Sequence, residues 1–156
     1  MSLRDQIRMS EEEVLELLEE ERTVICATNG VQGWPHLMPL WYVVRPTGED
    51  GTAQLWAWTF AKSQKARNLE RDPRATLEVE AGEAYDALRG VMLRCDVLVH
   101  GDLDVVRALG IDLYTRYGGV DDDVLAMIDK QAPKRIALQF AERSRVTWDH
   151  RKLAAA

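Results

Sequence analysis

The residues best suited to binding chemistry lie in one short segment, residues 62–74, which carries a local net charge of +3 in a chain whose formal net charge is −6. Its basic residues are Lys62, Lys65, Arg67, Arg71 and Arg74. Ser63 suits the N-cap of a helix and places Lys65 in the first turn, where unpaired N–H groups and the helix dipole bind phosphate. A lysine there opposes the dipole at a cost of ~0.3–1 kcal/mol, which a bound anion relieves. The segment therefore predicts a phosphate site; a capped helix with solvated lysines is the alternative interpretation.

Length and composition limit the classes of protein to which the chain can belong. Its 156 residues suit one domain spanning residues 1–156, and 46% hydrophobic with 29% charged residues is typical of a globular protein. The net charge of −6 argues against a nucleic-acid surface, which needs a basic face. No apolar run reaches the ~18–20 residues of a membrane span, so we expect a cytoplasmic protein without membrane contact. Cys26 and Cys95 lie in apolar runs without metal-ligand spacing, so we expect buried thiols and no metal site.

The elements that must position the basic segment follow from the hydrophobic pattern. A β-rich run at residues 23–28 ends at Asn29-Gly30, which is a hairpin signal. The next run, Trp34–Val44, is interrupted by Pro35 and Pro39. Because proline cannot donate to a strand ladder, each proline must lie where no neighbouring strand needs its N–H. Such a strand leaves backbone groups available to a ligand.

The remaining elements alternate between strands and helices. Further strands are expected at residues 54–60, 75–80, 89–99, 135–140 and 145–148. Helices are expected after Ser10, which forms a capping box with Glu13, after Ser63, from Asp104 to Tyr117, and from Asp121–Asp123 to Pro133. The short connections between the early strands favour antiparallel pairing. The pattern therefore predicts a mainly β fold with helices (α+β), in which six or so strands form an antiparallel barrel.

Two motifs give the sequence a resemblance to a known family. The first is Gly33-Trp34-Pro35-His36-Leu37-Met38-Pro39-Leu40-Trp41, and the second is Thr59 followed by Ser63-x-Lys65-x-x-Asn68-Leu69 and Arg71-Asp72-Pro73-Arg74. In this order they resemble the pyridoxamine 5′-phosphate oxidase-like superfamily, and most of all its flavin- and deazaflavin (F420)-dependent oxidoreductases. The resemblance covers about residues 10–150. It implies a six-stranded antiparallel split β-barrel with peripheral helices, which forms a homodimer with two cofactor sites at the interface.

The resemblance also implies roles for individual residues. Along the flavin ring it places His36, Met38, Pro39, Leu40 and Trp41. Around the cofactor phosphate it places Thr59, Ser63 and Lys65, with Lys62 and Arg67 close enough to help. Asn68 belongs to the motif, and orienting the helix explains it equally well. F420 and FMN share the ribityl-phosphate end, but Arg71 and Arg74 suit the acidic tail of F420, which slightly favours F420.

These expectations lead to one functional hypothesis and one alternative. The hypothesis is an oxidoreductase that transfers a hydride between bound F420 or FMN and a small apolar or aromatic acceptor, with the proton from solvent or from His36. Vitamin B6 oxidation is not expected, because the C-terminal arginine–histidine segment of true pyridoxamine phosphate oxidases is represented here only by His150 and Arg151. The alternative is a non-catalytic flavin or F420 carrier, or a haem-binding split-barrel protein with His36 or His100 as axial ligand.

Two groups of aromatic residues have more than one interpretation. Four tryptophans would suit a stacking surface for nucleic acid, but the net charge of −6 favours roles in the core and in ring stacking: Trp34, Trp41, Trp56 and Trp58. Tyr114 and Tyr117, one helical turn apart, either flank a pocket or pack their helix against the barrel.

Overall fold

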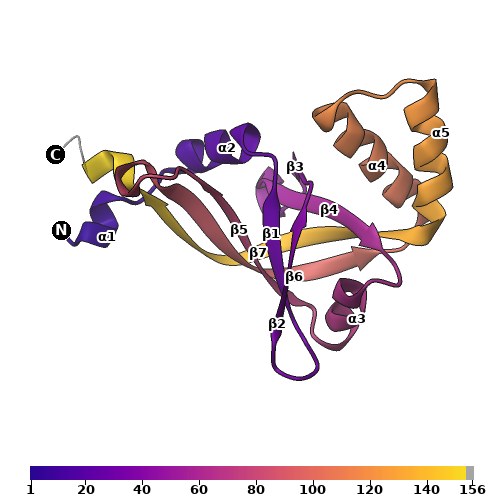
Figure 1. Cartoon of the computed structure of the whole chain (residues 1–156), viewed down its shortest axis with the longest axis horizontal. Helices are drawn as coiled ribbons and strands as arrows, with labels where there is room; N and C mark the ends of the chain where they lie inside the picture. Colours follow the sequence, from indigo (N-terminus) through magenta and orange to yellow (C-terminus); the bar gives the residue numbers. More distant parts are fainter. Residues whose placement is uncertain (154–156) are drawn as a thin grey trace.

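The computed structural model describes residues 1–153 and shows an α+β fold built on a curled antiparallel sheet (Figure 1). Within these residues the sheet has seven strands in the order β2-β1-β5-β6-β7-β4-β3. The strands are β1 (Val24–Asn29), β2 (Pro35–Leu40), β3 (Val43–Arg45), β4 (Gln54–Phe60), β5 (Arg74–Ala81), β6 (Arg89–His100) and β7 (Arg135–Asp149). The helices are α1 (Leu3–Gln6), α2 (Glu11–Glu20), α3 (Gln64–Arg71), α4 (Leu103–Tyr117) and α5 (Asp122–Gln131). Short 3-10 segments cover Glu49–Gly51, Tyr85–Ala87, Ala132–Lys134 and His150–Leu153.

The expectation of six strands was wrong: the part of the chain that the structure describes has seven. Residues 34–44, expected as one strand, contribute to two, β2 and β3. β2 pairs with β1 and β3 pairs with β4, at opposite edges of the sheet. Trp41 and Tyr42 carry the chain from one edge to the other, so the sheet curls into a half-barrel. Tyr42 is fully buried, and its hydroxyl donates to the Leu18 carbonyl at 2.7 Å, which fixes this crossing.

Both prolines of β2 lie where the strand needs no donor. The Gly30 N–H donates to the Trp34 carbonyl across the hairpin turn at 3.1 Å. The backbone N–H and C=O groups of successive residues in a strand point to alternate sides. Those of the even-numbered residues of β2 therefore point at β1. Pro35 and Pro39 therefore direct theirs at the outer edge of the sheet, as the sequence predicted.

β6 and β7 are the long strands in the middle of the sheet. β7 is continuous from Arg135 to Asp149, whereas the sequence pattern predicted two strands, at residues 135–140 and 145–148. The intervening residues remain in the ladder because β7 continues to pair with β6 across a register shift between Arg94 and Cys95. An irregularity of this kind bends a strand without ending it, so one strand serves both halves of the barrel.

The main hydrophobic core fills the concave side of the sheet. Alternate residues of the strands point inward, and Leu55 and Ala57 of β4 are examples. Helix α2 closes one end with Val14, Leu17 and Leu18, each at most 3% exposed. These side chains belong to the main core because α2 covers the open end of the barrel.

Helices α4 and α5 lie together beside β4, away from both chain ends (Figure 1). Asp102 caps α4, whereas the sequence suggested Asp104, which is instead the second residue of the helix. A Cβ at Gly110 would lie 2.6 Å from the indole of Trp58, so α4 approaches the outer face of β4 closely because residue 110 has no side chain. Of the helices within residues 1–153, α4 is the longest at 15 residues, and none is long and apolar enough to cross a membrane.

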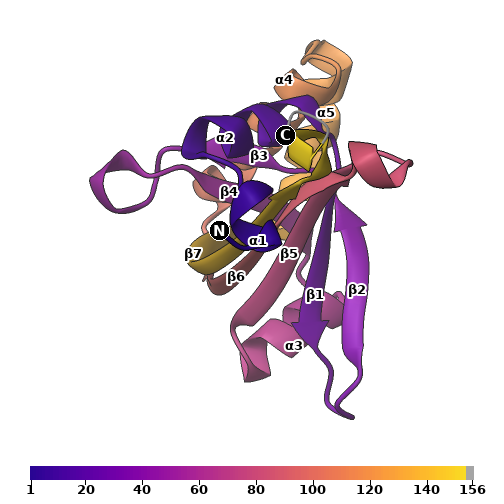
Figure 2. The same ribbon diagram turned by 90° about the vertical axis from the view of Figure 1, so that its left-hand side faces the viewer.

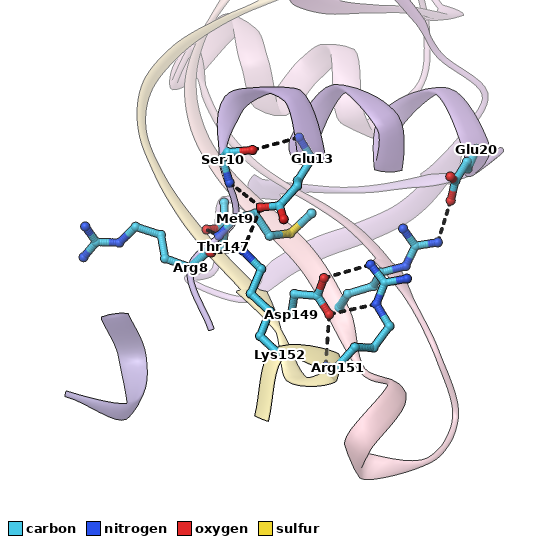
Figure 3. A network of polar contacts seen from close by, with 10 residues as sticks. Arg8, Met9, Ser10, Glu13, Glu20, Thr147, Asp149, Arg151 and Lys152 are labelled. Carbon is cyan, nitrogen blue, oxygen red and sulfur yellow. Dashed lines mark hydrogen bonds and ion pairs between the residues drawn. The ribbon is translucent and has the colours of Figure 1, made fainter. Parts of the chain in front are cut away.

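Polar contacts hold the first and last segments of the described chain together (Figure 3). Lys152 Nζ donates to the Arg8 carbonyl at 2.7 Å and to the Glu13 carboxylate at 2.8 Å. The Asp149 carboxylate accepts from the Arg151 guanidinium at 2.8 and 2.9 Å. These hydrogen bonds lower the pKa of the Glu13 and Asp149 carboxyls. We call this group, Glu13, Asp149, Arg151 and Lys152, the terminal clasp.

Candidate functional site

The basic segment folds as helix α3 and the turn before it. β4 ends at Phe60, and α3 begins at Gln64 beside one end of β1 (Figure 2). Ser63 is the N-cap, as the sequence predicted, and its hydroxyl accepts from the Ala66 N–H at 3.1 Å. The same oxygen lies 3.3 Å from the hydroxyl of Thr59, a buried residue near the end of β4. Two hydroxyls and the first N–H groups of a helix thus lie together, which is an arrangement that binds anions.

Lys65 is the unusual residue of this segment. It is 4% exposed, and the structure gives its ammonium group no hydrogen bond and no ion pair within residues 1–153. Burial lowers the pKa of Lys65. The neighbouring titratable group is the Cys26 thiol of β1, whose pKa burial raises to about 11, so this thiol is neutral near pH 7 and does not balance the ammonium charge. The Lys65 nitrogen is not among the buried polar atoms that lack a partner, so the stem of this side chain is buried while its charged end stays accessible. A small anion that reaches this end would pair with a charge that the fold leaves unpaired.

A hollow of about 640 Å³ opens beside the start of α3. Its lining residues are Phe60, Ala61, Lys62, Ser63, Pro133 and Lys134. Lys134 arrives there because β7 pairs with β4, and the Ala61 N–H donates to the Lys134 carbonyl at 2.9 Å. The next residue, Arg135, holds its guanidinium carbon 4.0 Å from the ring centre of Phe60 and 4.6 Å from that of Trp58. The hollow therefore combines aromatic surface with positive charge.

Two of the residues predicted to lie along the cofactor ring are next to this helix. In the register of β1 and β2, Met38 is opposite Cys26, the residue beside Lys65. His36 is opposite Thr28, and its Nδ1 is buried without a hydrogen-bond partner among the described residues. His36 and Met38 therefore lie on β2, the strand next to β1, and β1 is the strand that contacts α3.

Asn68 holds α3 against β1. The side chain is fully buried, and its amide nitrogen donates to the Thr28 hydroxyl at 3.1 Å. Its amide oxygen accepts from Gln64 at 2.9 Å and from Arg71 at 2.7 Å. The amide is therefore occupied by the fold, which favours the orienting role that the sequence left open.

The other predicted ring residues lie further along β2. Leu40 is partly buried against the core, and Pro39 is exposed. Trp41 follows the end of β2 and stacks on Tyr117, with 4.3 Å between ring centres. At ~3.3 Å per residue, Trp41 lies about 10 Å along the chain from Met38. The predicted residues therefore form an elongated site with α3 at one end and Trp41 at the other.

The remaining basic residues do not converge on Lys65. Lys62 borders the hollow, and Arg67 is exposed on α3. Arg71 donates to the amide oxygen of Asn68. The Arg74 guanidinium donates two hydrogen bonds of 2.8 Å to the Asp72 carboxylate, and these bonds hold the pKa of Asp72 well below its usual range. Arg74 also lines a separate hollow of about 590 Å³ with Arg94 and Arg143. Ala27 lines that hollow too and Cys26 faces the core, so the hollow lies across β1 from Lys65.

The other histidines and the cysteines have structural surroundings. His100 Nε2 lies 2.9 Å from the Gln139 amide oxygen, and its ring stacks on Trp56. His150 Nδ1 lies 2.7 Å from the Tyr85 carbonyl oxygen. Burial raises the pKa of the Cys95 thiol to about 12, as suits the buried thiol that the sequence predicted. Within residues 1–153 no cluster of three or more His, Cys, Asp and Glu side chains is arranged to hold a metal ion.

Sequence reasoning missed Lys134 and Arg135. Their only sequence signal is a basic pair after Pro133, which resembles an ordinary helix end. The pairing of Phe60 with Arg135 joins β4 to a strand far along the chain, and that pairing places both residues beside Lys62.

The structure is a curled antiparallel half-barrel in which the basic start of α3 lies near an exposed edge strand. A family model described as pyridoxamine 5′-phosphate oxidase matches residues 10–147, and the chain belongs to this family. No curated protein matches the sequence significantly.

Solved structures with the same fold cover nearly the whole chain. A conserved hypothetical protein of Mycobacterium tuberculosis is 37% identical with a TM-score of 0.85, and the match covers 99% of this chain and 93% of that protein. A haem storage protein of Vibrio cholerae is 17% identical with a TM-score of 0.67, covering 88% and 94%. An F420 reductase is 22% identical with a TM-score of 0.66, covering 87% and 98%. At the two lower identities the likeness shows the fold alone.

Proposed function

We propose that this protein is an oxidoreductase that transfers a hydride between a bound F420 or FMN cofactor and a small organic acceptor, as a homodimer with its cofactor sites at the interface. The observation that carries the proposal is Lys65 at the start of a helix: the residue is 4% exposed, and its ammonium group has no partner among residues 1–153. Membership of the pyridoxamine 5′-phosphate oxidase family and the shared fold of an F420 reductase support a flavin-type cofactor.

In this proposal Thr59, Ser63 and Lys65 hold the cofactor phosphate, and Lys62 and Arg67 add positive charge at the rim. The hydroxyls can donate hydrogen bonds, and the ammonium group supplies the charge that a phosphate needs. F420 and FMN present the same ribityl phosphate, so this group of residues fits both. The slight preference for F420 rested on arginines that the fold uses elsewhere, so we propose either cofactor without ranking them.

The exposed strand β2 gives the cofactor ring a surface, with His36, Met38, Pro39, Leu40 and Trp41 along it. The outward backbone groups of β2 remain available for hydrogen bonds at the edge of the sheet. When bound, the cofactor supplies the hydride chemistry, while the protein binds and orients it. His36 is the residue proposed to hold a proton, because its buried Nδ1 has no partner among residues 1–153.

The test is a titration of the freshly purified full-length protein with FMN, F420 and haemin, followed by absorbance. We expect FMN or F420 to bind with a Kd below about 100 µM, which corresponds to roughly 5.5 kcal/mol. If neither binds at that level, the oxidoreductase proposal fails. Preferential binding of haemin, lost in His36→Ala, would favour the haem-binding alternative.

Turnover then separates an enzyme from a carrier. With the reduced cofactor bound, we expect its absorbance to change when a small conjugated acceptor is added, and the acceptor to be recovered in reduced form. Tight binding without turnover of any acceptor would favour the carrier. Light scattering in solution tests the homodimer, and a monomer that binds the cofactor fully would contradict the interface site.

A further inference from the structure

A third hollow, of about 520 Å³, opens at the Trp41 end of β2, between the barrel and the loop that joins α4 to α5. Its walls include Trp41, Tyr114, Tyr117, Val120 and Val124, and we call it the aromatic pocket. It shares none of the residues that line the hollow beside α3, and it adjoins the surface proposed for the cofactor ring at Trp41.

The aromatic rings of this pocket are held in fixed positions. The Trp41 ring lies nearly parallel to the Tyr117 ring, with 12° between the ring planes. The Tyr114 ring packs edge-on against Trp41, with 5.6 Å between the ring centres. The Tyr117 hydroxyl donates to the Arg22 carbonyl at 2.7 Å and accepts from the Tyr42 N–H at 3.1 Å. These bonds fix the ring on which Trp41 rests. A flat indole surface is therefore kept rigid, which lowers the entropy cost of binding a flat ligand.

The same indole surface remains open. Trp41 is 45% exposed, although Tyr117 covers one of its faces. Gly118 and Gly119 also line the pocket, and Gly119 has a φ of +108°, a conformation that favours glycine. Because the glycines carry no side chains, the rim does not close over the indole.

The charge at the rim selects among flat ligands. Asp121 lines the pocket and caps α5, where its carboxylate accepts from the Val124 N–H at 2.8 Å. Asp122 and Asp123 follow in the first turn of α5. Of these three, Asp121 lines the pocket, and its carboxylate disfavours an anion at the rim, in contrast to the basic residues around Lys65. The guanidinium groups of Arg22 and Arg116 lie 5.6 and 5.1 Å from the Tyr117 ring centre, and neither residue lines the pocket.

We propose that the aromatic pocket binds a planar, conjugated, uncharged molecule that stacks on Trp41. Under the proposed function this molecule is the hydride acceptor, and that role rests on the proposed function. Binding itself depends only on the rings and the rim.

Three matched probes test the binding with the full chain and no cofactor, by ligand-observed NMR titration. The probes are 2-naphthol, which is planar and uncharged; decahydro-2-naphthol, which has the same skeleton but is not planar; and naphthalene-2-sulfonate, which is planar and anionic. We expect 2-naphthol to bind about tenfold more tightly than either of the others, since stacking and charge each favour it. Equal binding of the three probes would overturn the proposal.

Variants locate the binding. Trp41→Leu should weaken 2-naphthol binding about tenfold, since it removes the stacking surface. The matched control is Trp34→Leu, in the hairpin loop and 79% exposed, which should leave the affinity unchanged. Val120→Asp, in the surface loop, adds a negative charge to the pocket wall and should also weaken binding. This second variant tests the pocket even if Trp41→Leu disturbs the fold. Unchanged binding in both pocket variants would overturn the proposal.

Lys65→Met distinguishes this inference from the proposed function. We expect this variant to lose flavin binding and to keep 2-naphthol binding, because Lys65 does not line the aromatic pocket. If no flavin binds even to the unaltered protein while 2-naphthol still requires Trp41, the pocket stands and the proposed function fails.

Discussion

Two lysines at different places in the molecule show how differently the fold treats the same charge. Lys152 in the terminal clasp is about one-third exposed, and its ammonium group donates to a carbonyl and a carboxylate. Lys65 at the start of α3 is buried, and its ammonium group has no such partner among residues 1–153. A charge that the fold pairs serves stability, whereas a charge that the fold leaves unpaired at the end of a buried stem is available to a ligand.

The same contrast appears in the asparagine beside Lys65. Asn68 lies one helical turn from Lys65 in α3, yet all its hydrogen bonds are made within the fold. We infer that α3 has one side chain that anchors it and another that is kept for a ligand. The stability predictions below separate these two roles.

The largest effect on stability is expected for Asn68→Ala. This change leaves the buried Thr28 hydroxyl without its amide partner and removes the amide oxygen to which the exposed residues Gln64 and Arg71 donate, and it should lower the free energy of unfolding by about 2–3 kcal/mol. Urea unfolding at neutral pH measures it. A loss below about 0.5 kcal/mol would show that α3 is not anchored through Asn68.

A smaller effect is expected for Asp149→Asn, and it should depend on pH. The pKa of Asp149 lies below its ordinary value of 3.8 because of its bonds to Arg151, so the carboxylate stabilises the fold above that value and its contribution is lost as pH falls through the folded-state pKa. At neutral pH the variant should be less stable by about 1–2 kcal/mol. Unfolding curves at a series of pH values should show the gap closing below pH 3.8; a gap independent of pH would contradict the assignment.

The smallest effect is expected for Lys152→Met. Its ion pair with Glu13 is partly exposed, with 31% and 36% of the two side chains accessible, so removing it should cost at most about 1 kcal/mol. Added salt should reduce the difference between the two proteins in thermal melting, because salt screens an exposed pair. A difference that survives molar salt would indicate that the clasp is held by packing instead.

Much of the fold could be predicted from the sequence, because local signals are strong in it. The Ser10 and Ser63 caps, the Asn29-Gly30 hairpin and the antiparallel sheet were all predicted. The division of residues 34–44 was not, because the pattern there is uniformly apolar and the break at Trp41-Tyr42 follows from the curling of the sheet. The continuity of β7 was missed for a similar reason: the polar residues at its centre read as a turn, but pairing with β6 keeps them in the strand.

The candidate site could be predicted in part. The side chains around Lys65 share one local segment, so the sequence indicated them together. Lys134 and Arg135 join through long-range strand pairing, which no local pattern reveals. The sequence also left open whether Tyr117 flanks a pocket or packs its helix against the barrel. In the structure this residue does both: it packs α4 on the barrel and supports Trp41 beside the pocket.

The central claim is that Lys65 is kept for a ligand, and one variant tests it through two measurements. Lys65→Met should reduce the affinity for FMN or F420 by about 100-fold. The melting temperature of the cofactor-free protein should stay the same or rise, because methionine keeps an apolar side chain at this buried position and removes an unpaired charge that burial disfavours. The matched control Lys62→Met, an exposed lysine of the same segment, should weaken binding about threefold. An affinity unchanged in Lys65→Met, or a marked fall in the melting temperature of the cofactor-free variant, would contradict the account.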